Sequence, residues 1–176
     1  FGYSLIRTAD NNLADINSFM PSGFCGICHE REAKELRGSL HPASHTDPFY
    51  RGFAELAREE AGDKTYAFCS GCHSPAGVVS GFIPAEQEPD LPLPAKDGVS
   101  CDVCHQISSL TGIEGPWQEP GNASFVLKPG TTVRFGDSGQ VAKNSNHTGE
   151  KRDFFAKSEF CASCHTVIHP VNGLRI

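Results

Sequence analysis

A five-residue pattern, Cys-x-x-Cys-His, occurs four times in this chain of 176 residues, at 25–29, 69–73, 101–105 and 161–165. The pattern predicts covalent attachment of c-type haem. Its two thiols form thioethers with the two vinyl groups of a porphyrin, and the adjacent histidine becomes the proximal ligand of the iron. Four copies therefore predict four haem c groups, with electron transfer as their chemistry.

The predicted haem attachment accounts for every cysteine in the chain. The thioether residues are Cys25, Cys28, Cys69, Cys72, Cys101, Cys104, Cys161 and Cys164, and the proximal ligands are His29, His73, His105 and His165. No thiol remains for a disulfide or a nucleophile. Zinc is the alternative, because two Cys-x-x-Cys pairs can form a Cys₄ site, but zinc needs no histidine after each pair. A thioredoxin-like dithiol is disfavoured, since that motif occurs once, in a βαβ setting.

The histidine count gives a second, independent signal. Four of the eight histidines lie outside the motifs, one for each predicted haem: His41, His45, His147 and His169. Methionine is the other common sixth ligand, but Met20 is the only one in the chain. The count predicts four bis-histidine irons of low potential, whose filled sixth positions favour electron transfer over substrate chemistry.

The spacing of the spare histidines limits which haem each can serve. His41 and His45 are four residues apart, as are His165 and His169. Side chains four apart on a helix point the same way and cannot clamp the two faces of one porphyrin. We therefore expect His41 and His45 to serve two different haems, and His169 to serve a haem other than that of His165.

Length and composition predict a single domain with little polypeptide per cofactor. The chain has about 44 residues per predicted haem and an apolar share of 38%, below the usual globular share. The expected fold is mainly α with extensive loops, a small multihaem cytochrome c fold in which haems form much of the core. Residues 25–176 form the predicted tetrahaem domain, and residues 1–24 an arm that caps the first haem or contacts a neighbouring subunit.

Local sequence patterns predict a few helices, one loop and one short hairpin. Helices are predicted over 29–40, 47–60 and 153–165, and a proline-rich loop over 74–98, extended at 86–94. Asp47 suits a helix N-cap, with Pro48 as the first helical residue. Phe49, Phe53 and Leu56 share one face of this helix and are expected to cover a haem. Residues 124–127 and 131–135 predict at most one short β-hairpin.

The net charge limits which partners the protein can bind, and the haem motifs indicate the compartment in which it is found. The formal net charge is −6, and four ferric haems with ionised propionates take it to about −10. This balance excludes nucleic acid as a partner and leaves cationic redox proteins or an extracellular acceptor. No apolar run is long enough to span a membrane. Because c-type haem is attached outside the energy-conserving membrane, we expect an exported protein, periplasmic or extracellular, and Phe1 suggests a leader already removed.

The run from Cys25 to Asp47, CGICHEREAKELRGSLHPASHTD, resembles the opening of the tetrahaem cytochromes that accept electrons from hydroxylamine oxidoreductase. The stretches FCSGCHSPAG, DGVSCDVCHQI and EFCASCHTV resemble their later motifs in order and rough spacing. The resemblance covers about residues 25–168. It implies His41 as distal ligand of the fourth haem and His147 as distal ligand of the first.

The same resemblance leaves the other two irons open to more than one assignment. In that family the second haem lacks a distal ligand, whereas this chain has His45 one turn after His41, which we assign to the second haem. His169 remains for the third haem or for a haem of another copy, because the chain lacks the family's long C-terminal part.

The pattern is also similar to subunits of extracellular cytochrome filaments, small multihaem chains that polymerise and often lend a histidine ligand to a neighbour. Two function classes follow. The first is an electron carrier, as a shuttle between redox proteins or as the repeating unit of a haem wire. The alternative is a multihaem oxidoreductase or its electron-transfer subunit, acting on a small nitrogen or sulfur species at one open haem.

Overall fold

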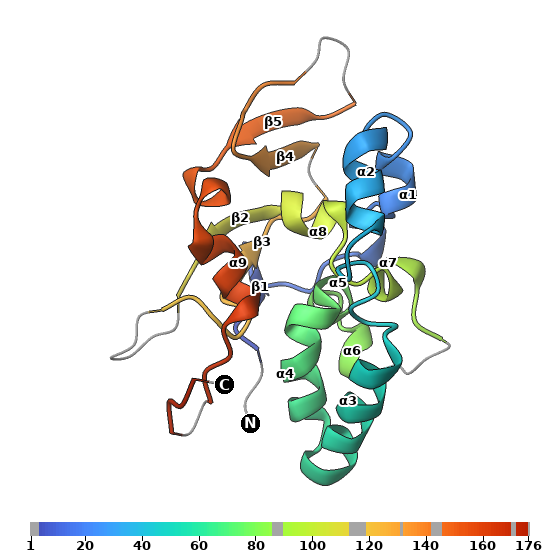
Figure 1. Cartoon of the computed structure of the whole chain (residues 1–176), viewed down its shortest axis with the longest axis vertical. Helices are drawn as coiled ribbons and strands as arrows, with labels where there is room; N and C mark the ends of the chain where they lie inside the picture. The colour runs from blue at the N-terminus through green and yellow to red at the C-terminus, as the bar shows by residue number, and fades with distance from the viewer. Residues whose placement is uncertain are drawn as a thin grey trace.

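The structure is a computed structural model and describes residues 4–85, 90–112, 119–130, 132–141, 146–169 and 172–175. Short helices predominate, with a few two- to four-residue strands (Figure 1). In chain order the elements are β1 (Arg7–Thr8), η1 (Ile16–Ser18), α1 (Ser22–Cys25), α2 (Glu30–Arg37), α3 (Pro48–Ala61), α4 (Asp63–His73), α5 (Pro75–Val79), α6 (Phe82–Ala85), α7 (Leu93–Lys96), α8 (Cys101–His105), β2 (Ile107–Leu110), β3 (Phe125–Leu127), β4 (Val133–Gly136), β5 (Thr148–Lys151), η2 (Asp153–Ala156) and α9 (Ser158–His165). The predicted class, mainly α with extensive loops, is confirmed.

The longest helices, α3 and α4, form an antiparallel hairpin. Asp47 caps α3 as predicted: its carboxylate accepts a hydrogen bond from the backbone N–H of Tyr50 at 2.9 Å, and Pro48 is the first helical residue. Gly62 ends α3 with a φ of +80°, a value that favours glycine, and the chain turns at once into α4. The second haem motif therefore lies on the last turns of a packed helix.

The strands pair differently from the predicted hairpin. Residues 124–127 and 131–135 do contain β3 and β4, but the two strands do not pair with each other. Instead β3 is the centre of a sheet in the order β1-β3-β2, parallel to β1 and antiparallel to β2. Strand β4 pairs in parallel with β5, with Val133 opposite Thr148. The physical reason is that all three residues of β3 are buried, so both of its edges need backbone partners.

The predicted loop at 74–98 contains three short helices, α5, α6 and α7. Pro75 and Pro94 lie in the first turns of α5 and α7, where the missing N–H costs no helical hydrogen bond. The prolines therefore exclude a long helix, as expected, but start short ones. The extended stretch predicted at 86–94 lies partly outside the described residues.

A continuous polypeptide core joins the arm to the rest of the molecule. Strand β1 pairs with β3, and Ile16 and Phe19 are buried among core residues from α4, α5, α8 and β3. The other core residues are Ala54, Tyr66, Ala76, Val79, Ile83, Leu91, Ala95, Val103, Ile107, Ala123, Phe125 and Leu127. The described part of the arm is thus packed onto its own chain.

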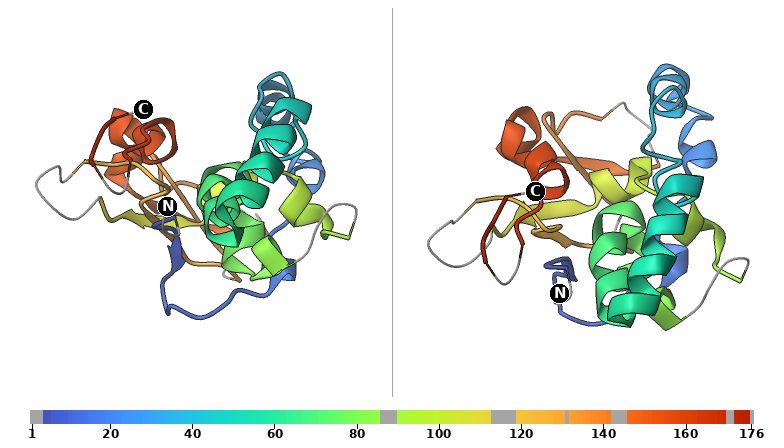
Figure 2. Two further views of the ribbon diagram at one scale, coloured as in Figure 1. Left: turned by 90° about the horizontal axis from the view of Figure 1, so that it is seen from below. Right: turned by 60° about the horizontal axis from the view of Figure 1, so that its bottom comes forward.

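The helices occupy opposite sides of the molecule. Helix α9 lies across from the α3–α4 hairpin, with α8 and the short strands between them, in all three ribbon views (Figures 1 and 2). No helix among the described residues is long and apolar enough to cross a membrane.

Candidate haem centres

Each haem motif is built on a helix end. The second and fourth motifs occupy the last turns of α4 and α9, and the third motif is the whole of α8. The first motif differs, because Cys25 ends α1 and His29 is the N-cap of α2. On a helical turn, residues three apart lie on one side, so the two thiols of a motif face the same porphyrin.

Two pairs of histidines from distant parts of the chain face each other. The ring centroids of His29 and His147 are 6.1 Å apart, and those of His41 and His165 are 6.0 Å apart. Two imidazoles whose nitrogens each lie about 2 Å from one metal have centroids about 6.3 Å apart. Both pairs therefore fit the space that a single iron between two axial imidazoles requires.

The other two proximal histidines are oriented by backbone carbonyls. The Nδ1 of His73 lies 2.8 Å from the Ser44 carbonyl oxygen, and the Nδ1 of His105 lies 2.7 Å from that of Phe135. A carbonyl only accepts, so Nδ1 carries the proton and donates, which leaves Nε2 for the iron. Burial also lowers the pKa of His73, which favours the neutral ring that ligation needs.

His45 and His73 lie on either side of contacts made by Ser44 and Tyr50. Ser44, the preceding residue, contacts the Nδ1 side of His73, and the Tyr50 ring stacks on His73 at 3.9 Å while lying 5.9 Å from the His45 ring. His45 itself is 1% exposed. Its role as a ligand of the second haem stays a prediction.

His169 lies in a turn near the C-terminal end of the described residues. Its backbone bonds to Leu174 and Gly173, and the backbone N–H of Asn172 donates to its Nδ1 at 3.4 Å. Nδ1 is therefore an acceptor here, unlike that of His73 or His105. Iron binding at Nε2 would require this hydrogen bond to be given up.

Thiols of different motifs meet in pairs. The thiol of Cys25 interacts with that of Cys101, and the thiol of Cys72 with that of Cys164, while Cys72 Sγ also donates to the Cys164 carbonyl at 3.8 Å. The first of these interactions lowers the pKa of Cys101 to about 6 and raises that of Cys25. Among the described residues, no group of three histidine, cysteine or acidic side chains is arranged to hold a metal ion. The thiols thus meet in twos, whereas a Cys₄ zinc site needs four at one point.

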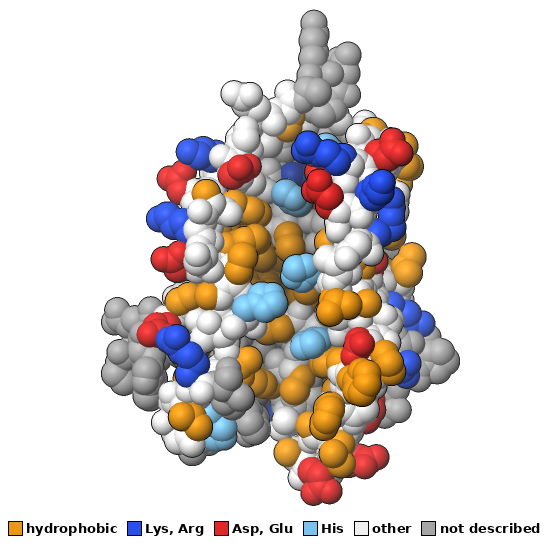
Figure 3. Space-filling view, viewed as in Figure 1, with side chains coloured by type: hydrophobic (Ala, Val, Ile, Leu, Met, Phe, Trp, Pro, Cys, Tyr) orange, Lys and Arg blue, Asp and Glu red, His pale blue; other side chains and the backbone are white. Residues whose placement is uncertain are grey.

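Apolar side chains surround the histidines on one face of the molecule. In Figure 3 histidine side chains form a row in a hollow that runs between the helical side and the strand side, with apolar side chains along it. Phe49 and Phe53, on the predicted apolar face of α3, are 77% and 71% exposed. The polypeptide alone leaves this face of α3 uncovered.

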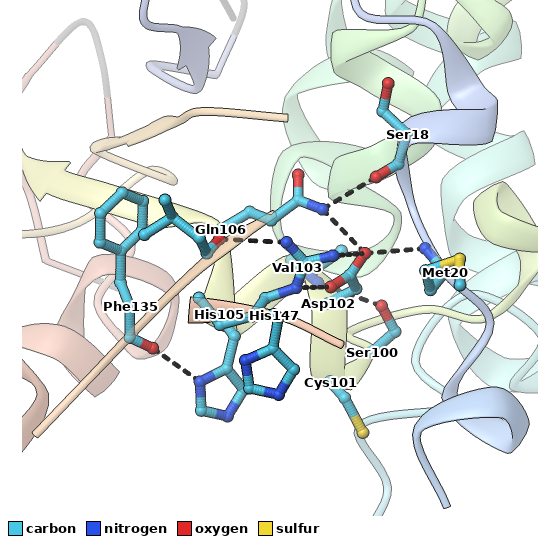
Figure 4. A network of polar contacts seen from close by, with 12 residues as sticks. Ser18, Met20, Ser100, Cys101, Asp102, Val103, His105, Gln106, Phe135 and His147 are labelled. Carbon is cyan, nitrogen blue, oxygen red and sulfur yellow. Dashed lines mark hydrogen bonds and ion pairs between the residues drawn. The ribbon is translucent and has the colours of Figure 1, made fainter. Parts of the chain in front are cut away.

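A buried carboxylate in the third motif was not foreseen from the sequence. Asp102 is 2% exposed, and its carboxylate accepts hydrogen bonds from Gln106 and from the Met20 backbone (Figure 4). Arg134 pairs with it at 2.6 Å. The residues between the two cysteines of this motif vary among its copies, so nothing in the pattern itself marks Asp102.

The chain is similar to known multihaem cytochromes. The family model for cytochrome c554 and c-prime matches residues 24–106. The fold is similar to that of a penta-heme cytochrome c552 from Thermochromatium tepidum, with a TM-score of 0.64 and 20% identity, over 92% of this chain and 49% of that one. This chain therefore spans about half the length of that structure. No curated protein matches the chain significantly.

The chain is thus similar to multihaem c-type cytochromes in its motifs and over residues 24–106, and its fold is similar to that of a multihaem cytochrome c. When bound, haem supplies a one-electron iron couple. The two thiols of each motif would hold the haem, and the adjacent histidine would present a neutral imidazole to its iron.

Proposed function

We propose that the protein carries electrons through four c-type haems, in the periplasm or outside the cell. The observation that carries this proposal is the pairing of His29 with His147 and of His41 with His165, at the separation one iron requires. With both axial positions filled by imidazole, the first and fourth haems would exchange electrons without binding substrate. The ligand of the third haem would be His169, from this chain or from a second copy.

The thiol contacts support a particular order of the haems. Because thioethers fix the porphyrin edge to the thiols, contact between two motifs brings two porphyrin edges together. The thiol of Cys25 interacts with that of Cys101, and the thiol of Cys72 with that of Cys164. Desolvation raises the pKa of the Cys104 thiol, and Cys104 lies close enough to Cys164 and Cys161 for their charges to raise this pKa further. We propose the order first, third, fourth, second. Electrons would then cross the protein between the first haem and the second, and outside partners would be redox proteins or further copies of the chain.

The position of His45 favours a second candidate function. His45 is 1% exposed, and the carbonyl of its neighbour Ser44 lies at Nδ1 of His73, not at Nε2. The second haem is therefore the candidate for an open sixth position. An oxidoreductase that acts on a small nitrogen or sulfur species would use such a site. Tyr50 of α3 stacks on His73, the proximal histidine of this haem. The exposed Phe49 and Phe53 lie on the same helix and would cover the haem.

Electron paramagnetic resonance of the oxidised protein tests these assignments. The variants His147→Ala and His41→Ala should each convert one low-spin haem to high spin. His45→Ala serves as the matched control and should leave the spin states of the wild type unchanged. If neither His147→Ala nor His41→Ala produces a high-spin signal, the proposed ligation is wrong. A new high-spin haem in His45→Ala would instead make His45 a ligand and close the second haem to substrate.

A further inference from the structure

The carboxylate of Asp102 is paired through a guanidinium fork. Arg134 Nε lies 2.6 Å from Oδ1, and Arg134 Nη2 lies 3.3 Å from Oδ2. The side chain of Asp102 is 2% exposed and that of Arg134 is 19% exposed. A buried carboxylate that loses the cation paired with it is strongly unfavourable, so α8, which carries Asp102, and β4, which carries Arg134, are held together.

The second carboxylate oxygen ties a third segment to this pair. Asp102 Oδ2 accepts from the Met20 backbone N–H at 2.8 Å and from Gln106 Nε2 at 2.7 Å, and Gln106 also donates to the Ser18 carbonyl at 2.9 Å (Figure 4). The N-terminal segment, α8 and β4 therefore meet at one buried charge. The donors to this carboxylate are the Met20 backbone, the side chain of Gln106 just after α8, and the guanidinium of Arg134 in β4.

Strand β4 in turn contacts the ligands of two haems. Phe135, the residue after Arg134, accepts the hydrogen bond from Nδ1 of His105 through its carbonyl. On the other edge, Val133 pairs with Thr148, the residue after His147. A shift of β4 along α8 would thus rotate the proximal imidazole of the third motif and move the distal imidazole that faces His29.

We infer that the Asp102–Arg134 ion pair is a positioning device that fixes β4 against α8 and so sets the ligand geometry of the third and first haems together. Neither side chain touches iron, and both act through Phe135 and Thr148. The inference rests on the proposed ligation by His105 and His147.

Removing either partner of the ion pair should shift the reduction potential of the third haem, in opposite directions for the two partners. Asp102→Asn leaves the guanidinium without its anion, and the added positive charge stabilises ferrous iron and raises the potential of the third haem. Arg134→Gln leaves a buried carboxylate without its cation and lowers that potential. Charge and hydrogen bonding around haem are among the factors that tune its potential. A general loosening of the fold would move both variants in the same direction.

Potentiometric titration and paramagnetic resonance of the haem-loaded protein test the inference. One haem potential should rise in Asp102→Asn, fall in Arg134→Gln and return toward the wild-type value in the double variant, which has no unpaired charge. Both single variants should also show high-spin iron from the first haem, because His147 is displaced. Arg31→Gln is the matched control: Arg31 is 80% exposed, pairs with Glu32 at 2.8 Å and loses the same charge, so it should shift potentials less.

Three results would overturn the inference. They are shifts of the same sign in the two single variants, shifts no larger than those of Arg31→Gln, and an unchanged low-spin signal in both. If a single variant does not load haem, the double variant Asp102→Asn/Arg134→Gln is tested in its place. A double variant that also fails to load haem would contradict the inference. An absence of any effect in His147→Ala would point instead to an error in the proposed ligation.

Discussion

Gly98 is the residue whose substitution should most directly displace a haem ligand without touching it. Its φ is +58°, and a Cβ built on it would lie 2.6 Å from the His41 carbonyl oxygen and 2.8 Å from that of Pro42. Both are backbone atoms, which cannot rotate aside as a side chain can. Gly98→Ala must therefore push the segment 41–44 away, and with it the imidazole that faces His165.

The cost of Gly98→Ala can be worked out from these contacts. A non-glycine residue in the left-handed region costs about 1 to 2 kcal/mol, and forcing an extra methyl group into a packed site costs about 1 to 3 kcal/mol. We expect a loss of about 2 to 5 kcal/mol in the free energy of unfolding. Gly130→Ala separates the two contributions, since its φ is +76° but its Cβ would meet only the hydroxyl of Ser18 at 3.2 Å. That control should lose about 1 to 2 kcal/mol.

Urea unfolding, followed by circular dichroism, measures the two free energies, and paramagnetic resonance measures the spin state. Gly98→Ala should show a lower unfolding midpoint than Gly130→Ala and a high-spin signal from the haem that His41 serves. The segment 41–44 also supplies the Ser44 carbonyl for His73, so the spectrum of the second haem should change too. Equal stability of the two variants, with wild-type spin states in both, would refute the reasoning.

Four further substitutions, at three places in the fold, give distinct outcomes. Asp97→Ala removes the carboxylate that accepts from both the backbone N–H and the hydroxyl of Ser22 at 2.9 Å, and urea unfolding should show a loss of about 1 to 3 kcal/mol. Phe49→Ala and Phe53→Ala should hardly change stability, but should lower one haem potential by admitting water, as a redox titration would show. His169→Ala should make one haem high-spin, and an unchanged low-spin spectrum would contradict its assignment.

Two further substitutions serve as controls, one for Asp97→Ala and one for the phenylalanine variants. Asp90→Ala removes an exposed carboxylate upstream of Asp97 and should leave the free energy of unfolding unchanged. Leu13→Ala removes an apolar side chain that is 74% exposed but belongs to the N-terminal segment, so no haem potential should move. Equal effects of Leu13→Ala and Phe53→Ala would mean that the face of α3 does not cover a haem.

The sequence predicted those parts of the molecule that depend on local chemistry. Asp47, Pro48 and Gly62 determine where α3 begins and ends, and each acts within a few residues of its own position. The Cys-x-x-Cys-His pattern is local too, because one helical turn presents the two thiols and the histidine together. Such signals need no knowledge of the rest of the fold.

The partners of the strands and of His45 depend on the tertiary fold, and the sequence did not predict them. Strand β3 could have paired with β4 across a short turn, but its burial on all residues selected β1 and β2 instead. His45 has the same spacing from His41 that a ligand could have, and its neighbour Ser44 contacts His73, but its assignment to the second haem stays a prediction. A spacing limits which side chains can meet, but the packing of other elements decides which do.

The proposed distal ligands would connect haem sites from distant parts of this chain, so that these sites fold together. His41 follows the first motif but faces the histidine of the fourth, and His147 precedes the fourth motif but faces the histidine of the first. Neither pair can close until the two ends of the chain have come together. With the proposed ligation, a histidine pair around iron would act as a cross-link between distant segments and would add to the apolar contacts of the fold. Partial loading with haem should therefore leave the first and fourth sites unstable together rather than one at a time.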